Sequence, residues 1–273
     1  MSRLGLAILI SALLLSPARA DTDIAGQLSA GRSSKVIAVV DGDTVRLAPP
    51  IDGADQVRLV GLQAPKLALG RKGFKPWPLG EESKRALEAL ILDRRVTLYF
   101  GGARMDRHGR HLAHLFRDDD GGNGLWIQGE MLGLGMARVY TFPDNRAVVA
   151  AMQARETAAR NQRLGIWSDP FYAVRAADDV AARLRELGTF QVITGTVIDA
   201  ARVKSRVYLN FGADWRSDFT VTLDARARRL FKKSGRDPLA LKGRTVRVRG
   251  WLNKRTGPMI EATHPEQIEL LGE

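Results

Sequence analysis

The side chains best suited to chemistry lie in three short motifs. Val40–Val45 reads Val-Asp-Gly-Asp-Thr-Val, Val57–Lys66 reads Val-Arg-Leu-Val-Gly-Leu-Gln-Ala-Pro-Lys, and Asp106–Arg110 reads Asp-Arg-His-Gly-Arg. Together they supply paired carboxylates and arginines, and the forked donors of arginine match tetrahedral oxyanions such as phosphate. Each motif alone has an ordinary structural interpretation, as a hairpin turn, an exposed strand residue or a second turn. Their occurrence in this order favours a functional site.

Taken together, the three motifs resemble the staphylococcal nuclease, or thermonuclease, family. The likeness also takes in Leu79–Glu81 before an expected helix, Gly133–Tyr140, and Leu164–Trp167. It covers about half of the chain, and ordered motifs at matching spacing are far more specific than any one alone.

The resemblance implies a calcium-dependent phosphodiesterase fold. By position, Asp43 matches the first metal-binding carboxylate, and Arg58 and Arg110 match two phosphate-binding arginines that stabilise charge developing in the transition state. The family pattern calls for a second metal-binding aspartate where this chain has Gln63. It calls for a glutamate that orients or deprotonates the attacking water where this chain has Lys66.

Both departures predict impaired hydrolysis. Calcium gains affinity from negatively charged oxygen ligands, so Gln63 weakens the expected site even if Asp41 compensates in part. A protonated lysine has no lone pair with which to accept a proton, and a general base contributes roughly 100-fold to 10,000-fold in rate. We therefore expect Lys66 to supply positive charge in place of the metal, which gives a metal-free phosphate clamp of Arg58, Lys66 and Arg110.

Two alternatives would preserve catalysis. Glu81 or Glu82 could fold back as a substitute base. Lys66 could itself act as the base if neighbouring cations favoured its neutral form, although solvent would screen them at an exposed site. These cations are Arg58, Arg71, Lys72 and Lys75.

A cationic loop follows the second motif. Arg71–Trp77 interleaves cations with Phe74 and Trp77, a pattern suited to stacking on unpaired bases beside a phosphate track. Lys72 and Trp77 are therefore candidate nucleic-acid-binding residues. The alternative is a lid whose aromatic side chains simply pack onto the barrel.

Other chemistry-bearing residues have weaker support. His111 and His114 point to opposite faces at strand period, so we assign no histidine to a metal. Asp118–Gly121 lacks the spaced ligands of a calcium loop and is expected to be a solvated turn. In the C-terminal part, Tyr208 and Phe211 with Arg206 are candidates for oligonucleotide binding along the second and third strands of a small barrel, with packing as the alternative.

The elements that must position the N-terminal motifs follow the order β-β-β-α-β-β and then helices. This order predicts a five-stranded OB-type barrel with a helical annex. The expected strands are Lys35–Val40, Thr44–Leu47, Val57–Leu62, Val96–Phe100 and Leu112–Phe116, and the expected helices are Glu81–Leu92, Leu125–Leu134 and Ala147–Arg163.

The C-terminal part repeats the β-β-β-α-β-β order, which predicts a second OB-like barrel and an α+β fold overall. The expected elements are strands Phe190–Ile198, Arg206–Phe211 and Phe219–Leu223, helix Ala225–Lys233, and strands Thr245–Trp251 and Met259–Ala262. We expect a thermonuclease-like domain over 21–175, a connecting helix over 176–189 and an OB-like basic domain over 190–273. The last of these carries 16 cations and 9 anions.

Composition and the N-terminal segment limit the classes of function that this chain can have. The 273 residues are 45% hydrophobic, which is enough for a sizeable core, and the net charge of +12 favours an anionic partner. Cysteine is absent, which excludes disulfides, thiol catalysis and cysteine-ligated metals. Arg3, the apolar run Leu4–Leu15 and Ala18–Ala20 predict a signal peptide over 1–20 and a protein exported to the periplasm or secreted. The alternative is an uncleaved membrane anchor; we expect no membrane span in the mature protein.

These features predict an exported protein that binds nucleic acid through its phosphodiesters and hydrolyses it poorly. Asp41, Asp43 and Gln63 are the candidate ligands of a weak calcium site. The first alternative is an active calcium-dependent endonuclease of DNA or RNA. The second is a non-enzymatic scaffold that docks protein or polyanions.

Overall fold

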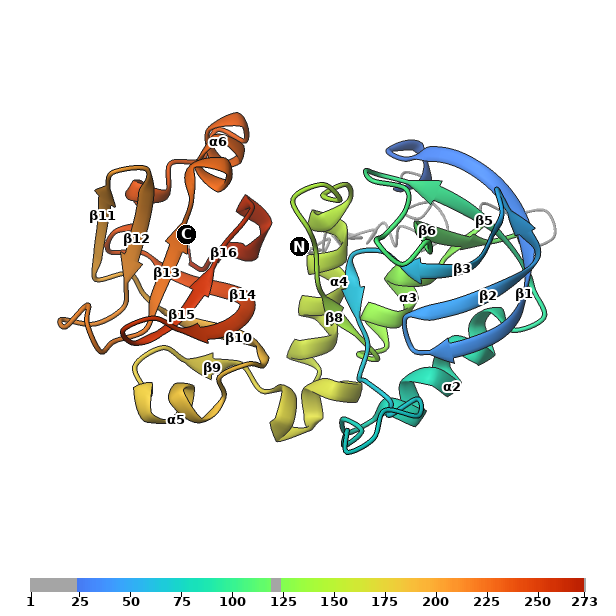
Figure 1. Cartoon of the computed structure of the whole chain (residues 1–273), viewed down its shortest axis with the longest axis horizontal. Coiled ribbons are helices and arrows are strands. Elements are labelled where there is room, and N and C mark those ends of the chain that lie inside the picture. Colours follow the sequence, from blue (N-terminus) through green and yellow to red (C-terminus); the bar gives the residue numbers. More distant parts are fainter. Residues whose placement is uncertain (1–23, 119–123, 273) are drawn as a thin grey trace, which may run out of the picture.

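In the computed structural model, which describes residues 24–118 and 124–272, the chain forms two lobes side by side (Figure 1). The expected signal peptide over 1–20 lies outside the described residues, as do residues 119–121 of the expected polar turn. Each lobe is built on a β-sheet with its own hydrophobic core. The mixture of sheets and helices confirms the α+β class.

The N-terminal lobe contains a closed five-stranded barrel. Its strands are β1 (Ser29–Asp41), β2 (Thr44–Ile51), β3 (Ala54–Leu59), β5 (Arg95–Phe100) and β6 (His111–Arg117). Long β1 pairs with both β2 and β5, and β3 pairs in parallel with β6 to close the barrel. Val45, Leu47, Val57 and Leu59 alternate along β2 and β3 and are at most 1% exposed, because every second side chain of a strand points inward.

Glycine interrupts the third strand. The strand expected to run through Leu62 stops at Leu59, because Gly61 has a φ of 84°, a left-handed conformation that turns the chain. The next two residues form β4 (Leu62–Gln63), which pairs with β8 (Arg138–Val139). This turn carries Gln63 and the residues after it across the end of the barrel.

Helices cover the barrel as the annex predicted from sequence. They are α2 (Gly80–Ile91), α3 (Ile127–Gly133) and α4 (Val149–Asn161), followed by 3-10 turns at Gly165–Ser168 and Pro170–Tyr172. Leu87 and Ile91 of α2 are fully buried, in agreement with the helical spacing of apolar residues. The helix expected over Leu125–Leu134 begins later than predicted, at Ile127, because Leu125 and Trp126 form β7, which pairs with β6.

The C-terminal lobe repeats the barrel topology. It contains β9 (Arg175–Ala176), β10 (Phe190–Thr196), β11 (Asp199–Val203), β12 (Arg206–Asn210), β13 (Thr220–Leu223), β14 (Thr245–Lys254), β15 (Pro258–Glu261), β16 (Ile268–Leu270), α5 (Val180–Arg185), α6 (Ala225–Lys233) and 3-10 turns at Pro238–Leu241 and Pro265–Gln267. Its strands follow the order β11-β12-β13-β15-β14-β10-β9. The parallel β13–β15 pair corresponds to the β3–β6 closure of the first barrel, so the OB-like architecture expected for both parts is confirmed.

The segment between the barrels differs from the expected connecting helix over 176–189. Only α5 is helical, and β9 before it pairs in parallel with β10. Leu184 of the expected apolar stripe is 38% exposed, whereas Arg183 is buried. The apolar spacing was misleading because Arg183 pairs with Glu186 and donates to the carbonyl of Ala176. These contacts bury the side of α5 that carries Arg183.

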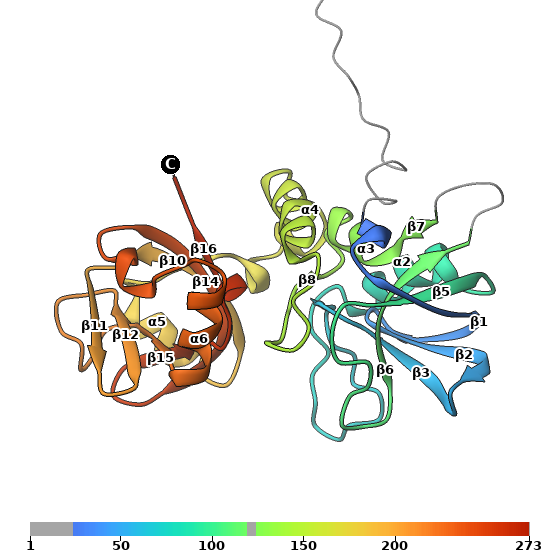
Figure 2. The ribbon, with the colours of Figure 1, turned by 90° about the horizontal axis from the view of Figure 1, so that it is seen from above.

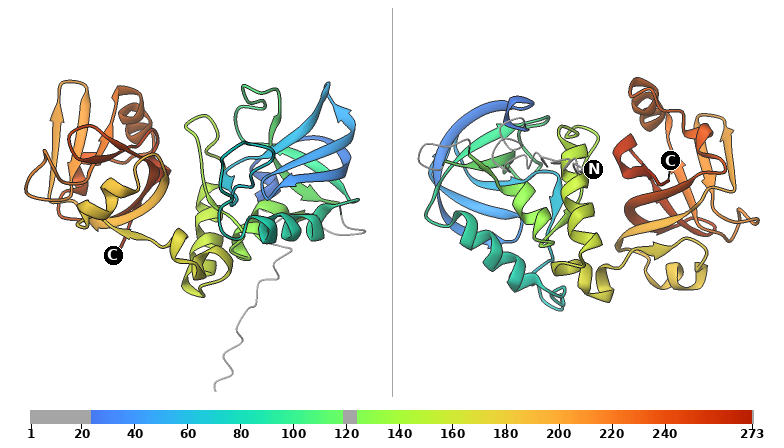
Figure 3. Two further views of the ribbon diagram at one scale, coloured as in Figure 1. Left: turned by 60° about the horizontal axis from the view of Figure 1, so that its bottom comes forward. Right: turned by 180° about the vertical axis from the view of Figure 1, so that it is seen from behind.

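Helix α4 stands between the two lobes (Figures 2 and 3). Arg249 of β14 reaches it and lies 2.7 Å from the Glu156 carboxylate, and both side chains are at most 1% exposed. Arg146 forms a second ion pair with Glu266 at 2.7 Å. A short hydrogen bond joins Thr141 to His264 at 2.7 Å. Buried charges thus connect the barrels.

Candidate functional site

The hairpin between β1 and β2 carries the paired carboxylates. Asp41 accepts a hydrogen bond from the backbone N–H of Asp43 at 3.1 Å, which closes the turn. Gly42 leaves no room for a side chain, because a Cβ there would lie 2.1 Å from Oγ of Ser83 and 2.7 Å from Cβ of Ala64. The start of α2 and the segment after β4 therefore press directly on the turn.

Asp43 is the centre of the site and is buried. Its Oδ2 accepts from Lys66 Nζ at 2.7 Å and from the backbone N–H of Ala64 at 2.9 Å, and it pairs with Arg58 at 3.1 Å. Burial by itself would raise the pKa of Asp43, but the charges of Arg58 and Lys66 and these hydrogen bonds outweigh it and hold the pKa well below its usual range. The negative charge of the Asp43 carboxylate is therefore already neutralised by Arg58 and Lys66.

Asp41 has the opposite character. Burial, and then repulsion from Asp43, raise the pKa of Asp41 above its ordinary value, although Lys66 and Arg58 oppose the rise. One oxygen of Asp41 also already accepts a hydrogen bond from the backbone N–H of Asp43.

Arg58 is held by the fold. One terminal nitrogen donates to the carbonyls of Leu59 at 2.6 Å and Asp43 at 3.3 Å, and the other donates to the carbonyl of Leu62 at 2.7 Å and faces the Asp43 carboxylate. The structure therefore brings Arg58, Lys66 and Asp43 together as expected. Through the carbonyls of Leu59 and Leu62, Arg58 also stabilises the backbone turn between β3 and β4.

These residues do not fit calcium as they stand. The Lys66 ammonium lies against the Asp43 oxygen that would hold the ion, and calcium requires six to eight oxygen ligands. Across the described residues there is no group of three or more histidine, cysteine, aspartate and glutamate side chains that could hold a metal.

Gln63 faces a different partner. Its Oε1 accepts two hydrogen bonds from Arg138, at 3.0 Å from Nε and 2.8 Å from a terminal nitrogen. The β4–β8 register sets Gln63 directly opposite Arg138, and both are buried. Arg138 in turn stacks on Phe190 of the second barrel, 4.6 Å from the ring centroid. The amide is committed to this contact rather than to the carboxylates of the hairpin.

Arg110 immediately precedes β6 and pairs with Asp106. Its Nε and a terminal nitrogen lie 2.8 and 2.7 Å from Oδ2 of Asp106. Gly109, with a φ of 74°, makes the tight turn that allows this pairing. Within the described chain, Arg110 forms no hydrogen bond or ion pair with Asp43, and its carboxylate partner is Asp106. Arg110 borders a separate cavity of about 460 Å³ beside Asp55 and Gln56.

The cationic loop divides into exposed and packed residues. Lys72 and Lys75 are exposed. Trp77 packs near Phe171 with a centroid distance of 5.7 Å, and its backbone N–H donates to the carbonyl of Lys66 at 2.9 Å. Trp77 thus follows the packing alternative here. Arg71 stacks on Phe74 and is also exposed, so it and the two lysines are the accessible cations of the loop.

The alternative bases lie at the start of α2. Glu81 and Glu82 are exposed, and Glu82 pairs with Arg85 at 3.3 Å. No contact joins either glutamate to Asp43 or Lys66 in the part of the chain that the structure describes. As an ammonium that donates to Asp43, Lys66 is also unsuited to act as a base in this arrangement.

His111 and His114 have structural roles. His111 bonds to the Ile51 carbonyl at 2.8 Å, and His114 accepts from the indole of Trp126 at 3.3 Å. Burial lowers the pKa of His114 to about 3, so it is neutral.

The three candidate nucleic-acid-binding residues of the second barrel lie in different environments. Phe211 packs on Phe219 in the core and Arg206 pairs with Glu261, whereas Tyr208 remains on the outer face.

Sequence reasoning missed two contributors to the site. The Ala64 N–H that binds Asp43 has no side-chain signal, because any residue except proline supplies it. Arg138 lies 75 residues from its partner Gln63, and no local pattern connects them. By contrast, the spacing of Asp106 and Arg110 within one short turn was a local signal for their pairing.

Comparison with known proteins agrees with this geometry. The family model described as "Staphylococcal nuclease homologue" matches residues 56–169. A protein named "Thermonuclease" from Staphylococcus intermedius is 26% identical over 155 residues, 55% of this chain and 81% of that protein. "Protein ParB" from Escherichia coli is 31% identical over 143 residues, 50% of this chain and 72% of that protein. "Probable staphylococcal-like nuclease CAN1" from Oryza sativa subsp. japonica is 30% identical over 113 residues, 41% of this chain and 29% of that protein.

With the closed barrel, the helical annex and the Asp43–Arg58 pair in place, the chain belongs to the staphylococcal nuclease homologue family. The family suggests nuclease activity or nucleic-acid binding. The match ends at residue 169, before β9 and the whole second barrel. None of the described helices is both long and apolar enough to span a membrane.

Proposed function

We propose that this protein binds nucleic acid through its phosphodiester groups without calcium and that its hydrolytic activity is impaired. The observation that carries the proposal is the ion pair between Lys66 and Asp43 at 2.7 Å, in which an ammonium occupies the carboxylate expected to hold the metal. The water-activating glutamate of the family is also replaced by this same lysine.

The cations proposed to bind phosphate are Lys66 in that pair, Lys72 on the loop that follows it and Arg110 beside Asp106. The side chains of Lys66 and Arg110 are 23% and 28% exposed, and Lys72 is exposed on the neighbouring loop. A phosphate would bind to Lys66 and Arg110 while Lys66 still contacts Asp43 and Arg110 still contacts Asp106. Arg58 instead holds the backbone of the site in place through its hydrogen bonds to three carbonyls. Phosphate contacts of this kind make binding strongly dependent on salt.

Binding of a short fluorescent single-stranded oligonucleotide, measured by anisotropy in chelator over a range of salt, tests the clamp. Lys66→Gln and Arg110→Gln should each weaken binding and reduce the salt slope by about 1. Lys35→Gln is the matched control, because Lys35 pairs with Asp93 on the distant face of β1 and its loss removes the same charge. Equal slopes in all variants would contradict the clamp. Arg58→Ala is less informative, because it removes bonds to three carbonyls and tests folding.

The same protein assayed on DNA and RNA with calcium and with chelator separates binding from catalysis. We expect little cleavage in either condition. Robust calcium-dependent cleavage that Asp43→Asn abolishes would overturn the impaired-hydrolysis proposal and favour the active endonuclease that the names of the relatives suggest. Absence of nucleic-acid binding would favour the scaffold alternative.

We also propose that the protein acts after export, on the basis of the apolar run Leu4–Leu15 and the small residues Ala18 and Ala20. Fractionation of cells that express the full chain, followed by N-terminal sequencing, tests this. A mature protein beginning near Asp21 outside the cytoplasm is the expected result, and an intact N-terminus in the cytoplasmic fraction would contradict it.

A further inference from the structure

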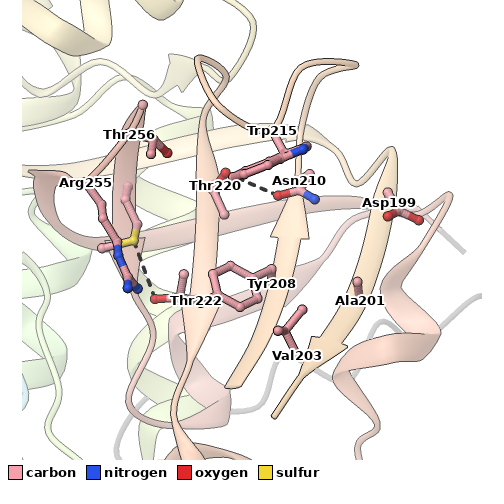
Figure 4. Close-up of a pocket in the computed structure, with 12 residues that line it drawn as sticks. Asp199, Ala201, Val203, Tyr208, Asn210, Trp215, Thr220, Thr222, Arg255 and Thr256 are labelled. Atoms are coloured by element: carbon pink, nitrogen blue, oxygen red, sulfur yellow. Dashed lines mark hydrogen bonds between the residues drawn. The ribbon is translucent and has the colours of Figure 1, made fainter. Parts of the chain in front are cut away.

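A groove of about 530 Å³ lies on the outer face of the second barrel (Figure 4). Strands β11, β12, β13 and β15 form its floor, and the loop after β12 and the β14–β15 turn form its rim. Tyr208 lies flat on the floor, Trp215 and Arg255 stand at the rim, and Met259 lies beside Thr222. This groove is separate from the Asp43 site in the other lobe.

The groove exposes apolar and aromatic side chains where an outer barrel face is usually polar. Along β12, Val207 and Leu209 point into the core, so Tyr208 points outward. Trp215 is 54% exposed and Val203 is 55% exposed. Exposed apolar surface that is gathered in a concave site indicates ligand binding more strongly than single scattered residues do.

The rim is held in place before any ligand binds. Asp218 accepts from the backbone N–H of Asp214 at 2.7 Å, and Asp214 accepts from the backbone N–H of Arg216 at 3.1 Å. A Cβ on Gly257 would lie 2.4 Å from the Ser217 carbonyl, so the two rim segments touch. The loop with Trp215 and the turn with Arg255 are therefore held relative to each other, which lowers the entropic cost of binding.

The charges around the groove favour an anionic ligand. Arg255 lines the groove, Lys204 follows the lining residue Val203, and Lys254 is the last residue of β14; all three are exposed, and none pairs with a carboxylate within the described residues. Of the acidic neighbours, Asp199 pairs with Lys242 at 2.7 Å and Glu261 pairs with Arg206 at 3.4 Å, whereas Asp214 and Asp218 accept hydrogen bonds within the rim loop. Cations at two edges of an aromatic floor match a phosphate backbone that passes over stacked bases.

We propose that this groove is a second nucleic-acid site, which takes unpaired bases of a single strand on Tyr208 and Trp215 and phosphates on Lys204, Lys254 and Arg255. A duplex is excluded from this mode because its bases stack on one another and leave no face for an aromatic side chain. The site goes beyond the function proposed for the Asp43 cluster and shares no residue with it. Either proposal can therefore fail without the other.

Anisotropy of the full chain with a fluorescent oligothymidylate in chelator tests the proposal. Tyr208→Ala and Trp215→Ala should each weaken binding about 5-fold to 150-fold, the range expected for loss of one stacked base. Tyr208→Phe keeps the ring and should bind as the unmodified chain does. A thermal melt of each variant establishes that it is folded.

Two variants that each remove one positive charge distinguish binding in the groove from nonspecific attraction to the basic protein. Arg255→Gln should weaken binding and reduce the salt slope, whereas Arg226→Gln removes an exposed cation from α6, outside the groove, and should change binding little. A duplex of the same sequence should bind independently of Tyr208. If both alanine variants fold and bind oligothymidylate as tightly as the unmodified chain, the proposal is overturned. The groove would then be assigned to another class of partner, such as a peptide.

Discussion

At the scale of single residues, the key feature is Lys66, which stands where the family resemblance calls for a glutamate. The ammonium neutralises Asp43, which is 1% exposed and whose charge would otherwise be costly to bury. Arg58 contributes to the same neutralisation from β3. Under the proposed function, this one residue stands in place of the expected base and also contacts the carboxylate expected to hold the metal.

Lys66→Glu tests this interpretation. Three carboxyl groups would then face one another, so the folded state should lose about 3 to 5 kcal/mol without divalent cations. Calcium should restore part of the loss, by about 2.7 kcal/mol at one hundred times its dissociation constant. Thermal unfolding with calcium and with chelator measures the effect. Lys35→Glu is the control and should show no calcium response, and an equally unresponsive Lys66→Glu would contradict the site.

At the scale of elements, the site depends on how closely the β1–β2 hairpin and α2 approach each other. Gly42 permits the contact, and Ser83 at the start of α2 donates to the Met136 carbonyl at 2.7 Å. The hairpin, the helix and the segment before β8 therefore form one packed unit. This packing sets where Asp43 lies relative to Ala64 and Lys66.

Gly42→Ala should disturb this packing. The new methyl group would overlap Ser83 and Ala64, and overpacking of this kind costs about 1 to 3 kcal/mol. Urea unfolding of the variant measures the loss. Gly133→Ala is the matched control, because a Cβ at Gly133 meets nothing within 4 Å and should cost no stability. Equal stability of the two variants would show that the turn yields without strain.

At the scale of the whole molecule, buried charges join the two barrels. Burial by itself would raise the pKa of Glu156, but the charge and hydrogen bonds of Arg249 outweigh it and lower the pKa. Arg249 also pairs with Glu269 and donates to the Val139 carbonyl at 3.2 Å. A buried network of this kind constrains relative placement because it tolerates few other arrangements.

Glu156→Gln should destabilise the chain by about 3 to 5 kcal/mol, because it leaves the Arg249 charge incompletely paired in the interior. Chemical unfolding measures the loss. Asp52→Asn breaks the Arg32–Asp52 pair, whose side chains are 73% and 69% exposed, and should cost at most about 1 kcal/mol. Similar losses in the two variants would contradict a stabilising role for the buried network.

Acid should weaken the same interface. Burial, helped by Arg146 and Arg249, lowers the pKa of His264 to about 4, against about 6.5 in an unfolded chain. Between these values the unfolded state binds more protons, so stability is fully present above pH 6.5 and falls as the pH drops toward 4. One such histidine contributes up to about 1.4 kcal/mol per pH unit.

Unfolding curves between pH 4 and 7 check this sign. Buried His114 contributes a similar dependence, so His264→Gln should reduce the slope without removing it. His108→Gln is the control, because His108 is exposed, and it should leave the slope unchanged. An unchanged slope for His264→Gln would contradict the assignment.

The order of strands and helices could be read from sequence, because alternation, helical spacing and turn residues are local signals. The hairpin at Asp41–Asp43, α2 and the repeated barrel order were predicted in this way, whereas the assignment of Gln63 and Lys66 to acidic positions came from the family resemblance. The connecting segment was mispredicted because Arg183 is buried by its partners rather than by hydrophobicity.

Only the tertiary structure decided which charges meet. Lys66 could have faced solvent, but the packing of the hairpin against α2 brings its ammonium to Asp43, 23 residues away. Gln63 pairs with Arg138, and Arg249 pairs with Glu156 93 residues away in sequence. Such contacts depend on the closure of both barrels and on which side chains become buried next to each other. No local sequence pattern predicts either of these.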